Sequence, residues 1–92
     1  MSNIDRSKMI TAQMKAEQAA AALLTQVQAE TARLRSIADV AIAPLQDAVD
    51  LDEATDSEAA LLKEWKRYRV ALNRLPEQQG YPAEISWPAP PA

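Results

Sequence analysis

Small and apolar residues follow a helical repeat through the first half of the chain. From Leu24 onward they recur at alternating spacings of three and four residues, with one threonine among them. The positions are Leu24, Val27, Thr31, Leu34, Ala38, Ala41, Leu45 and Ala48. This spacing places them on one face of an α-helix. From Ile37 the face widens to include Val40, Ile42 and Val49, and a wide face favours a globular contact over a narrow coiled-coil seam.

The segment before this repeat is expected to be a helical arm, residues 1–33. It is rich in Ala, Gln, Glu, Lys and Leu, which are good helix formers, and a start near Ser2 or Asn3 places Asp5 in the first turn. The seam weakens upstream of Leu24, where Gln13 and Glu17 occupy the extrapolated positions. The arm could therefore fray alone, or it could form a coiled coil with other chains.

Helix breakers divide the rest of the chain. Pro44 is the only proline before Leu75, and no glycine precedes Leu75. A proline inside an isolated helix costs about 3 kcal/mol, so we expect a kink or a brief break at Pro44, with Leu45 to Leu51 still helical. Beyond Leu75 lie five prolines and the single glycine, which predicts an extended, proline-rich tail over residues 76–92.

A second helix has a well-marked start. Thr55-Asp56-Ser57-Glu58 fits a capping box, in which Thr55 and Glu58 satisfy each other's backbone N–H groups. Its apolar positions are Leu61, Trp65, Tyr68, Leu72 and Leu75, and Pro76 ends it.

The short turn near residues 52–56 predicts an antiparallel helical hairpin over residues 34–75. The fold class is therefore all-α. Folding back about this turn predicts four pairs: Leu45 with Leu62, Val40 with Tyr68, Ile37 with Leu72, and Asp39 with Arg69.

The amino-acid composition excludes several kinds of catalytic and metal-binding site. The chain has 92 residues, a net charge of −3, no histidine and no cysteine. The commonest general base, the commonest transition-metal ligand and thiol chemistry are therefore absent. Nothing gathers the remaining carboxylates, lysines and hydroxyls into a reactive site, so we predict no catalytic residues, no cofactor and no metal. We find neither a signal peptide nor a run of about 20 apolar residues, and we expect a soluble cytoplasmic protein.

Two charged clusters have simple explanations. Cations interleaved with aromatic residues (Lys63, Lys66, Arg67, Arg69 and Arg74 with Trp65 and Tyr68) could form a nucleic-acid patch. The aromatic residues share the apolar face, however, and the negative net charge argues against nucleic acid, so we favour a solvated cationic face.

Acidic residues (Asp47, Asp50, Asp52, Glu53, Asp56 and Glu58) gather at the hairpin tip, where a helix start favours them. They lack the glycine turn and the closing glutamate of a calcium loop.

The tail holds an alternating stretch, Ile85-Ser86-Trp87, between prolines. Trp87 could pack back near Trp65, form part of a partner groove, or do both. The literal PxxP from Pro88 to Pro91 has no flanking arginine that would support a docking ligand.

An ordered series of segments resembles the C-terminal part of the tail fibre assembly chaperones of tailed phages and prophages. The segments are Ile42 to Leu51, Glu53-Ala54-Thr55, Leu61 to Val70, Asn73-Arg74 and Ile85-Ser86-Trp87-Pro88. The resemblance covers roughly residues 30–88. Many members carry an N-terminal β-rich domain, and in this sequence the alanine-rich arm from Ser2 to Arg33 stands in that place.

The resemblance implies a non-catalytic chaperone. Such a protein would bind the distal tip of a trimeric tail fibre, help it to fold and trimerise, and in some members stay on the mature fibre. By position, Trp65, Tyr68, Arg69, Trp87 and Pro88 match the family's motif residues. We expect the partner surface to comprise these five with Leu72 and Ile85. The alternative is a coiled-coil scaffold that assembles through the N-terminal helix and has no chaperone role.

Overall fold

Two helices form an antiparallel hairpin, as expected. The computed structural model describes the backbone of residues 2–92 and the side chains of residues 12–92. Helix α1 (Ser2–Asp50) is much longer than α2 (Asp56–Asn73), and a short 3-10 helix η1 (Leu75–Glu77) follows. Over the described backbone there is no strand, which confirms the all-α prediction. Neither helix, within the described residues, is long and apolar enough to cross a membrane.

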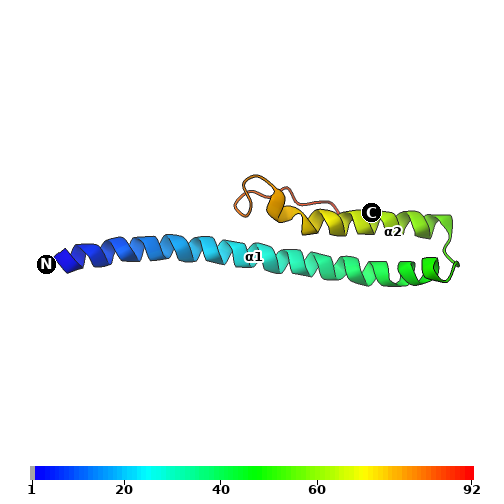
Figure 1. Cartoon of the computed structure of the whole chain (residues 1–92), viewed down its shortest axis with the longest axis horizontal. Coiled ribbons are helices and arrows are strands. Elements are labelled where there is room, and N and C mark those ends of the chain that lie inside the picture. Colours follow the sequence, from blue (N-terminus) through cyan, green and yellow to red (C-terminus); the bar gives the residue numbers. More distant parts are fainter. Residues whose placement is uncertain (1) are drawn as a thin grey trace.

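The two helices overlap along only part of α1. Figure 1 shows α2 lying against the second half of α1, while the first half projects beyond it. In α1 the first buried side chain among those described is Val27, and the molecule measures 76 × 20 × 17 Å. The described side chains before Leu24 are all exposed, so packing within this chain adds little to the stability of that part of the arm.

Helix α1 continues through Pro44 without interruption, so of the two expected outcomes the break is wrong and the kink stays a prediction. It ends at Asp50, one residue before the expected limit. Good helix formers flank Pro44, and α1 packs against α2 there through Ile42 and Leu45. Burial of that face offsets the backbone hydrogen bond that proline removes.

The turn between the helices uses main-chain hydrogen bonds that the sequence did not predict. The N–H of Asp52 donates to the Val49 carbonyl (3.0 Å), and the N–H of Glu53 donates to the Ala48 carbonyl (2.8 Å). Asp52 has a left-handed backbone, with φ of 59°. Together these features form a Schellman motif, with an aspartate where glycine is usual. Aspartate is one of the few residues that enter this region at modest cost.

The start of α2 confirms the predicted capping box. The Glu58 N–H donates to Thr55 Oγ1 (3.1 Å), and the Thr55 N–H donates to Glu58 Oε1 (3.0 Å). Two of the backbone donors that a helix start leaves open are therefore satisfied by one pair of residues.

The core lies where the helices overlap and where the chain returns after η1. Its buried members are Ala38, Ile42, Leu62, Tyr68, Leu72 and Leu75. The partly buried residues around them are Leu34, Leu45, Trp65, Tyr81 and Ile85. Thr31 is also buried in α1, and its hydroxyl donates to the Val27 carbonyl (2.7 Å).

The predicted widening of the α1 face is wrong for three of its residues. Ile37, Val40 and Val49 are exposed, Val40 by 75%. The expected contacts of Val40 with Tyr68 and of Ile37 with Leu72 are therefore not supported. The side that faces α2 is the narrow repeat together with Ile42. The Asp39–Arg69 pair is confirmed, with Arg69 Nη1 donating to Asp39 Oδ1 at 3.0 Å.

Candidate partner-binding surface

The seven residues predicted to contact a partner fall into buried and accessible groups. Tyr68 and Leu72 are buried between the helices, so they hold the hairpin together and offer no surface to a partner. Trp65 and Ile85 are half-buried at the edge of the same core. Trp87 is 40% exposed, and Pro88 beside it is half-buried.

Trp65 packs against Tyr68 from the neighbouring turn of α2. Their ring centroids lie 5.8 Å apart and the rings are at 80°, an edge-to-face arrangement that adds roughly 0.5–1.5 kcal/mol to burial alone. Arg69, the residue after Tyr68, donates a hydrogen bond to Asp39 on α1. Trp65 and Arg69 therefore each make a specific contact with another residue of this chain.

The tail returns from η1 alongside α2, on the side away from α1, as Figure 1 shows. Its turn contains Gly80, whose φ of 92° lies in the region that glycine tolerates, and the Glu84 N–H donates to the Gly80 carbonyl (2.9 Å). No helix or strand is present from residue 85 to residue 92.

One side chain fixes the tail through its main chain. Gln78 Nε2 donates to the Ser86 carbonyl (2.9 Å), and the Ser86 N–H donates to Gln78 Oε1 (2.9 Å). The side-chain amide of Gln78 therefore makes the pair of hydrogen bonds that a neighbouring strand would make in a sheet. These bonds hold the main chain of the residue before Trp87.

Burial along the tail has a period of three. Ile85, Pro88 and Pro91 are half-buried, and the residues between them are exposed. A period of three is typical of polyproline II, in which every third side chain shares a side. Trp87 is thereby on a different side of the tail from the residues that face the hairpin.

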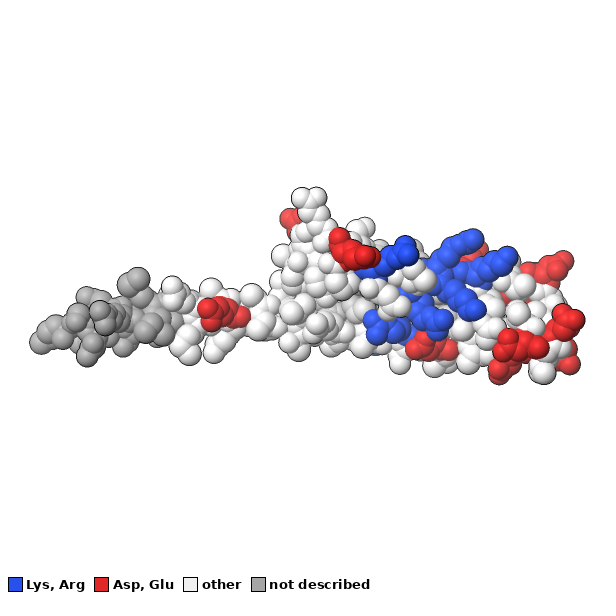
Figure 2. Space-filling model, in the orientation of Figure 1, with Lys and Arg blue, Asp and Glu red and all other residues white. Residues whose placement is uncertain are grey.

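A cationic groove lies on the outer side of α2. Its lining residues are Lys66, Arg67, Val70, Ala71, Arg74, Glu77 and Gln78, and its volume is about 630 Å³. Figure 2 shows the blue lysine and arginine side chains gathered over the middle of the hairpin, with red acidic side chains at its tip. The sequence did not predict this groove, because the cations of a solvated face and the cations of a groove have the same spacing along a helix.

The arrangement offers no sign of a metal site in the part of the chain that is described. Among residues 12–92, no group of three or more acidic side chains converges in a way that could hold a metal ion. Five of the six acidic residues at the hairpin tip are exposed, and Glu58 is half-buried.

Comparison with known proteins decides the family. Residues 3–92 match the family described as Caudovirales tail fibre assembly protein, lambda gpK. The chain belongs to this family. The match extends well beyond the segments that carried the resemblance, into the N-terminal arm.

Individual relatives agree with this assignment. The chain is 50% identical to the tail fiber assembly protein of Escherichia phage lambda over 58 residues, which is 63% of this chain and 29% of that protein. It is equally similar over 58 residues to Protein TfaD of Escherichia coli K12, covering 63% of the chain and 30% of the relative. A probable tail fiber assembly protein of Acyrthosiphon pisum secondary endosymbiont phage 1 is 44% identical over 69 residues, or 75% and 43% of the two chains. The chain thus spans less than half the length of these relatives. No solved structure matches it.

Proposed function

We propose that this chain acts as a tail fibre assembly chaperone that binds the distal end of a trimeric tail fibre and assists its folding and trimerisation. Membership of the tail fibre assembly family over residues 3–92 carries this proposal. The relatives are named for fibre assembly in phage lambda and in other phages. The host cytoplasm is the place where such a step would occur, and the chaperone could stay on the fibre of the finished particle.

The physical need for such a partner is clear. An unassembled chain of a β-rich fibre exposes strand edges and apolar surface that promote aggregation. A rigid hairpin with an exposed tryptophan on its tail could cover part of that surface. Of the seven residues expected to bind, we retain Trp87 and Pro88 as contacts, with Trp65, Arg69 and Ile85 at the edge of the surface. We assign Tyr68 and Leu72 to the core because both are buried.

The test is co-expression with a tail fibre protein from the same genome. We expect the two proteins to co-purify and the soluble yield of fibre trimer to rise. A chain that neither co-purifies with the fibre nor increases soluble fibre would overturn the proposal. The matched control is the variant Leu72→Ala, which should lose the effect only in proportion to its loss of folded protein.

A second candidate function rests on the projecting arm. Met14 and Leu23 are exposed on the part of α1 that α2 does not cover, and a hollow there is lined by Met14, Glu17, Gln18 and Ala21. The arm could join other copies in a coiled-coil scaffold, with or without a chaperone role. Sedimentation equilibrium over a range of concentrations would show self-association, and a strict monomer would exclude the scaffold while leaving the chaperone proposal intact.

A further inference from the structure

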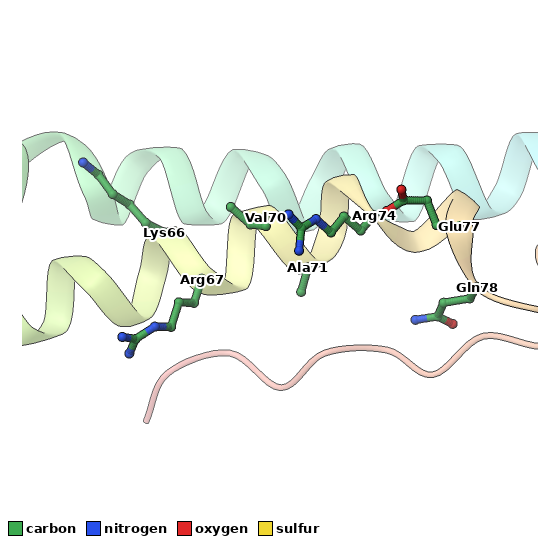
Figure 3. A pocket seen from close by; sticks show the side chains of 7 residues that line it. All are labelled: Lys66, Arg67, Val70, Ala71, Arg74, Glu77 and Gln78. Carbon is green, nitrogen blue, oxygen red and sulfur yellow. The ribbon is translucent and has the colours of Figure 1, made fainter.

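The cationic groove on α2 has the composition of a peptide-binding site. Val70 and Ala71 form an apolar floor in the last turn of α2, and Val70 is 44% exposed. Figure 3 shows these two side chains between Lys66 and Arg67 at one end and Arg74 at the other, with the tail running alongside. Three cations and one carboxylate, Glu77, line the groove.

The cations of the groove have no ion-pair partner within the described side chains. The salt bridges among residues 12–92 are Arg33–Glu30 and Arg69–Asp39, and neither involves a groove residue. Outside the groove, Arg33 does have a carboxylate partner: its hydrogen bonds to Glu30 lower the pKa of the Glu30 carboxyl. Lys66, Arg67 and Arg74 are therefore available to a carboxylate from another molecule.

The gathering of cations in the groove runs against the negative net charge of the whole chain. The net charge is −3, yet the groove gathers three cations around an apolar floor, and the acidic residues of the hairpin lie mainly at its tip. Such a local field favours an acidic ligand, and the exposed valine favours an apolar side chain in the same ligand.

We propose that the groove binds an acidic segment of the partner polypeptide, with carboxylates facing Lys66, Arg67 and Arg74 and an apolar side chain resting on Val70 and Ala71. This rests on the proposed function, because it takes the partner to be the tail fibre. Duplex nucleic acid is a poorer fit, since it presents no apolar side chain and its phosphates would also approach the acidic tip. Continuity with the tail supports a shared surface, because Gln78 both lines the groove and holds the main chain beside Trp87.

The test compares charge reversals in the full chain. Arg67→Glu combined with Arg74→Glu should weaken binding to the purified C-terminal region of the fibre at least about tenfold at low salt, which is about 1.4 kcal/mol. The control is Arg35→Glu combined with Lys15→Glu, which makes the same change in net charge at exposed positions outside the groove. Wild-type binding should also weaken as salt is raised from about 0.05 to 0.5 M, because salt screens exposed charges.

A third variant tests the apolar floor. Val70→Lys adds a cation but removes the apolar side chain, so the proposal expects weaker binding, whereas a purely electrostatic site would bind more tightly. Circular dichroism and the melting temperature must show that each variant is folded. If a variant does not fold, the single change Arg67→Glu, at an exposed position without a described ion pair, provides the same comparison.

The outcomes are distinct. Fibre binding by the wild type that survives the groove reversals overturns the groove proposal and leaves the chaperone proposal standing. A wild type that binds no fibre overturns both. Two further results would contradict the fibre as occupant: self-association of the wild type that the groove reversals abolish would identify a second copy of this chain, and tight binding of duplex DNA lost in the same variants would identify nucleic acid.

Discussion

At the scale of single residues, the structure separates side chains that the sequence could not. Trp65, Tyr68 and Leu72 share one helical spacing, and all three were expected at a partner surface. Tyr68 and Leu72 are buried, whereas Trp65 is only half-buried. A periodic pattern reports which side of a helix is apolar, but it does not tell whether the neighbour that covers this side belongs to the same chain.

Leu72→Ala should strongly destabilise the protein. The Leu72 side chain is fully buried between the helices, and removing it leaves a cavity in a small core, which typically costs about 2–5 kcal/mol. Urea unfolding followed by circular dichroism measures the loss. Leu72→Met, which nearly conserves volume, should cost less than about 1.5 kcal/mol. An alanine variant as stable as the wild type would show that this residue does not lie in the core.

The Asp39–Arg69 ion pair should contribute little to stability although it was correctly predicted. Both side chains remain partly exposed, at 53% and 35%, and exposed pairs contribute about 0–1 kcal/mol. A double-mutant cycle with Asp39→Ala and Arg69→Ala measures the coupling free energy. A coupling well above this range would indicate that the pair acts as part of a larger network.

At the scale of elements, local chemistry predicted the helices better than their ends and their covered sides. The capping box at Thr55 was readable because it depends on a few adjacent residues. The break at Pro44 was wrong because packing against α2 outweighs a local penalty. The exposure of Val40 was also missed, since the rotation of α1 against α2 depends on contacts far apart in the sequence.

Thr55→Ala should destabilise α2 by about 1 kcal/mol. The change removes the hydroxyl that accepts the Glu58 N–H, and loss of such a cap typically costs about 0.5–2 kcal/mol. Thr55→Ser should restore most of the loss because it keeps the acceptor. The matched control is Ser57→Ala, two residues further along at an exposed position. Equal unfolding midpoints for Thr55→Ala and Ser57→Ala would contradict the importance of the cap.

At the scale of the whole molecule, the hairpin could be predicted but its functional surface could be predicted only in part. The order of segments identified the family, and the family match confirms it. The groove could not be predicted, because its lining combines residues of α2 with Glu77 and Gln78, whose positions depend on how the chain turns after Asn73. A tail without regular structure follows no periodic rule that would place it from sequence alone.

The two tryptophans should respond differently to substitution. Trp65→Ala should lower the melting temperature, since it removes the edge-to-face contact with Tyr68 and part of the core. Trp87→Ala should change the melting temperature little, because Trp87 is 40% exposed, but it should weaken fibre binding. Calorimetric melting and titration with the fibre's C-terminal region measure both effects. A Trp87→Ala variant that binds the fibre like the wild type would remove Trp87 from the proposed surface.

The bidentate amide of Gln78 has a mechanical consequence. Because the Gln78 amide makes both main-chain hydrogen bonds at Ser86, it restrains the tail next to Trp87, and the helices do not depend on these two bonds for their own. Gln78→Ala removes the acceptor of the Ser86 N–H together with the donor to the Ser86 carbonyl, so amide exchange at Ser86 should quicken while exchange within α2 stays slow. Loss of both hydrogen bonds would leave Ser86 held only by the packing of its neighbours, so this one amide adds directional restraint to a segment that otherwise rests on apolar contacts.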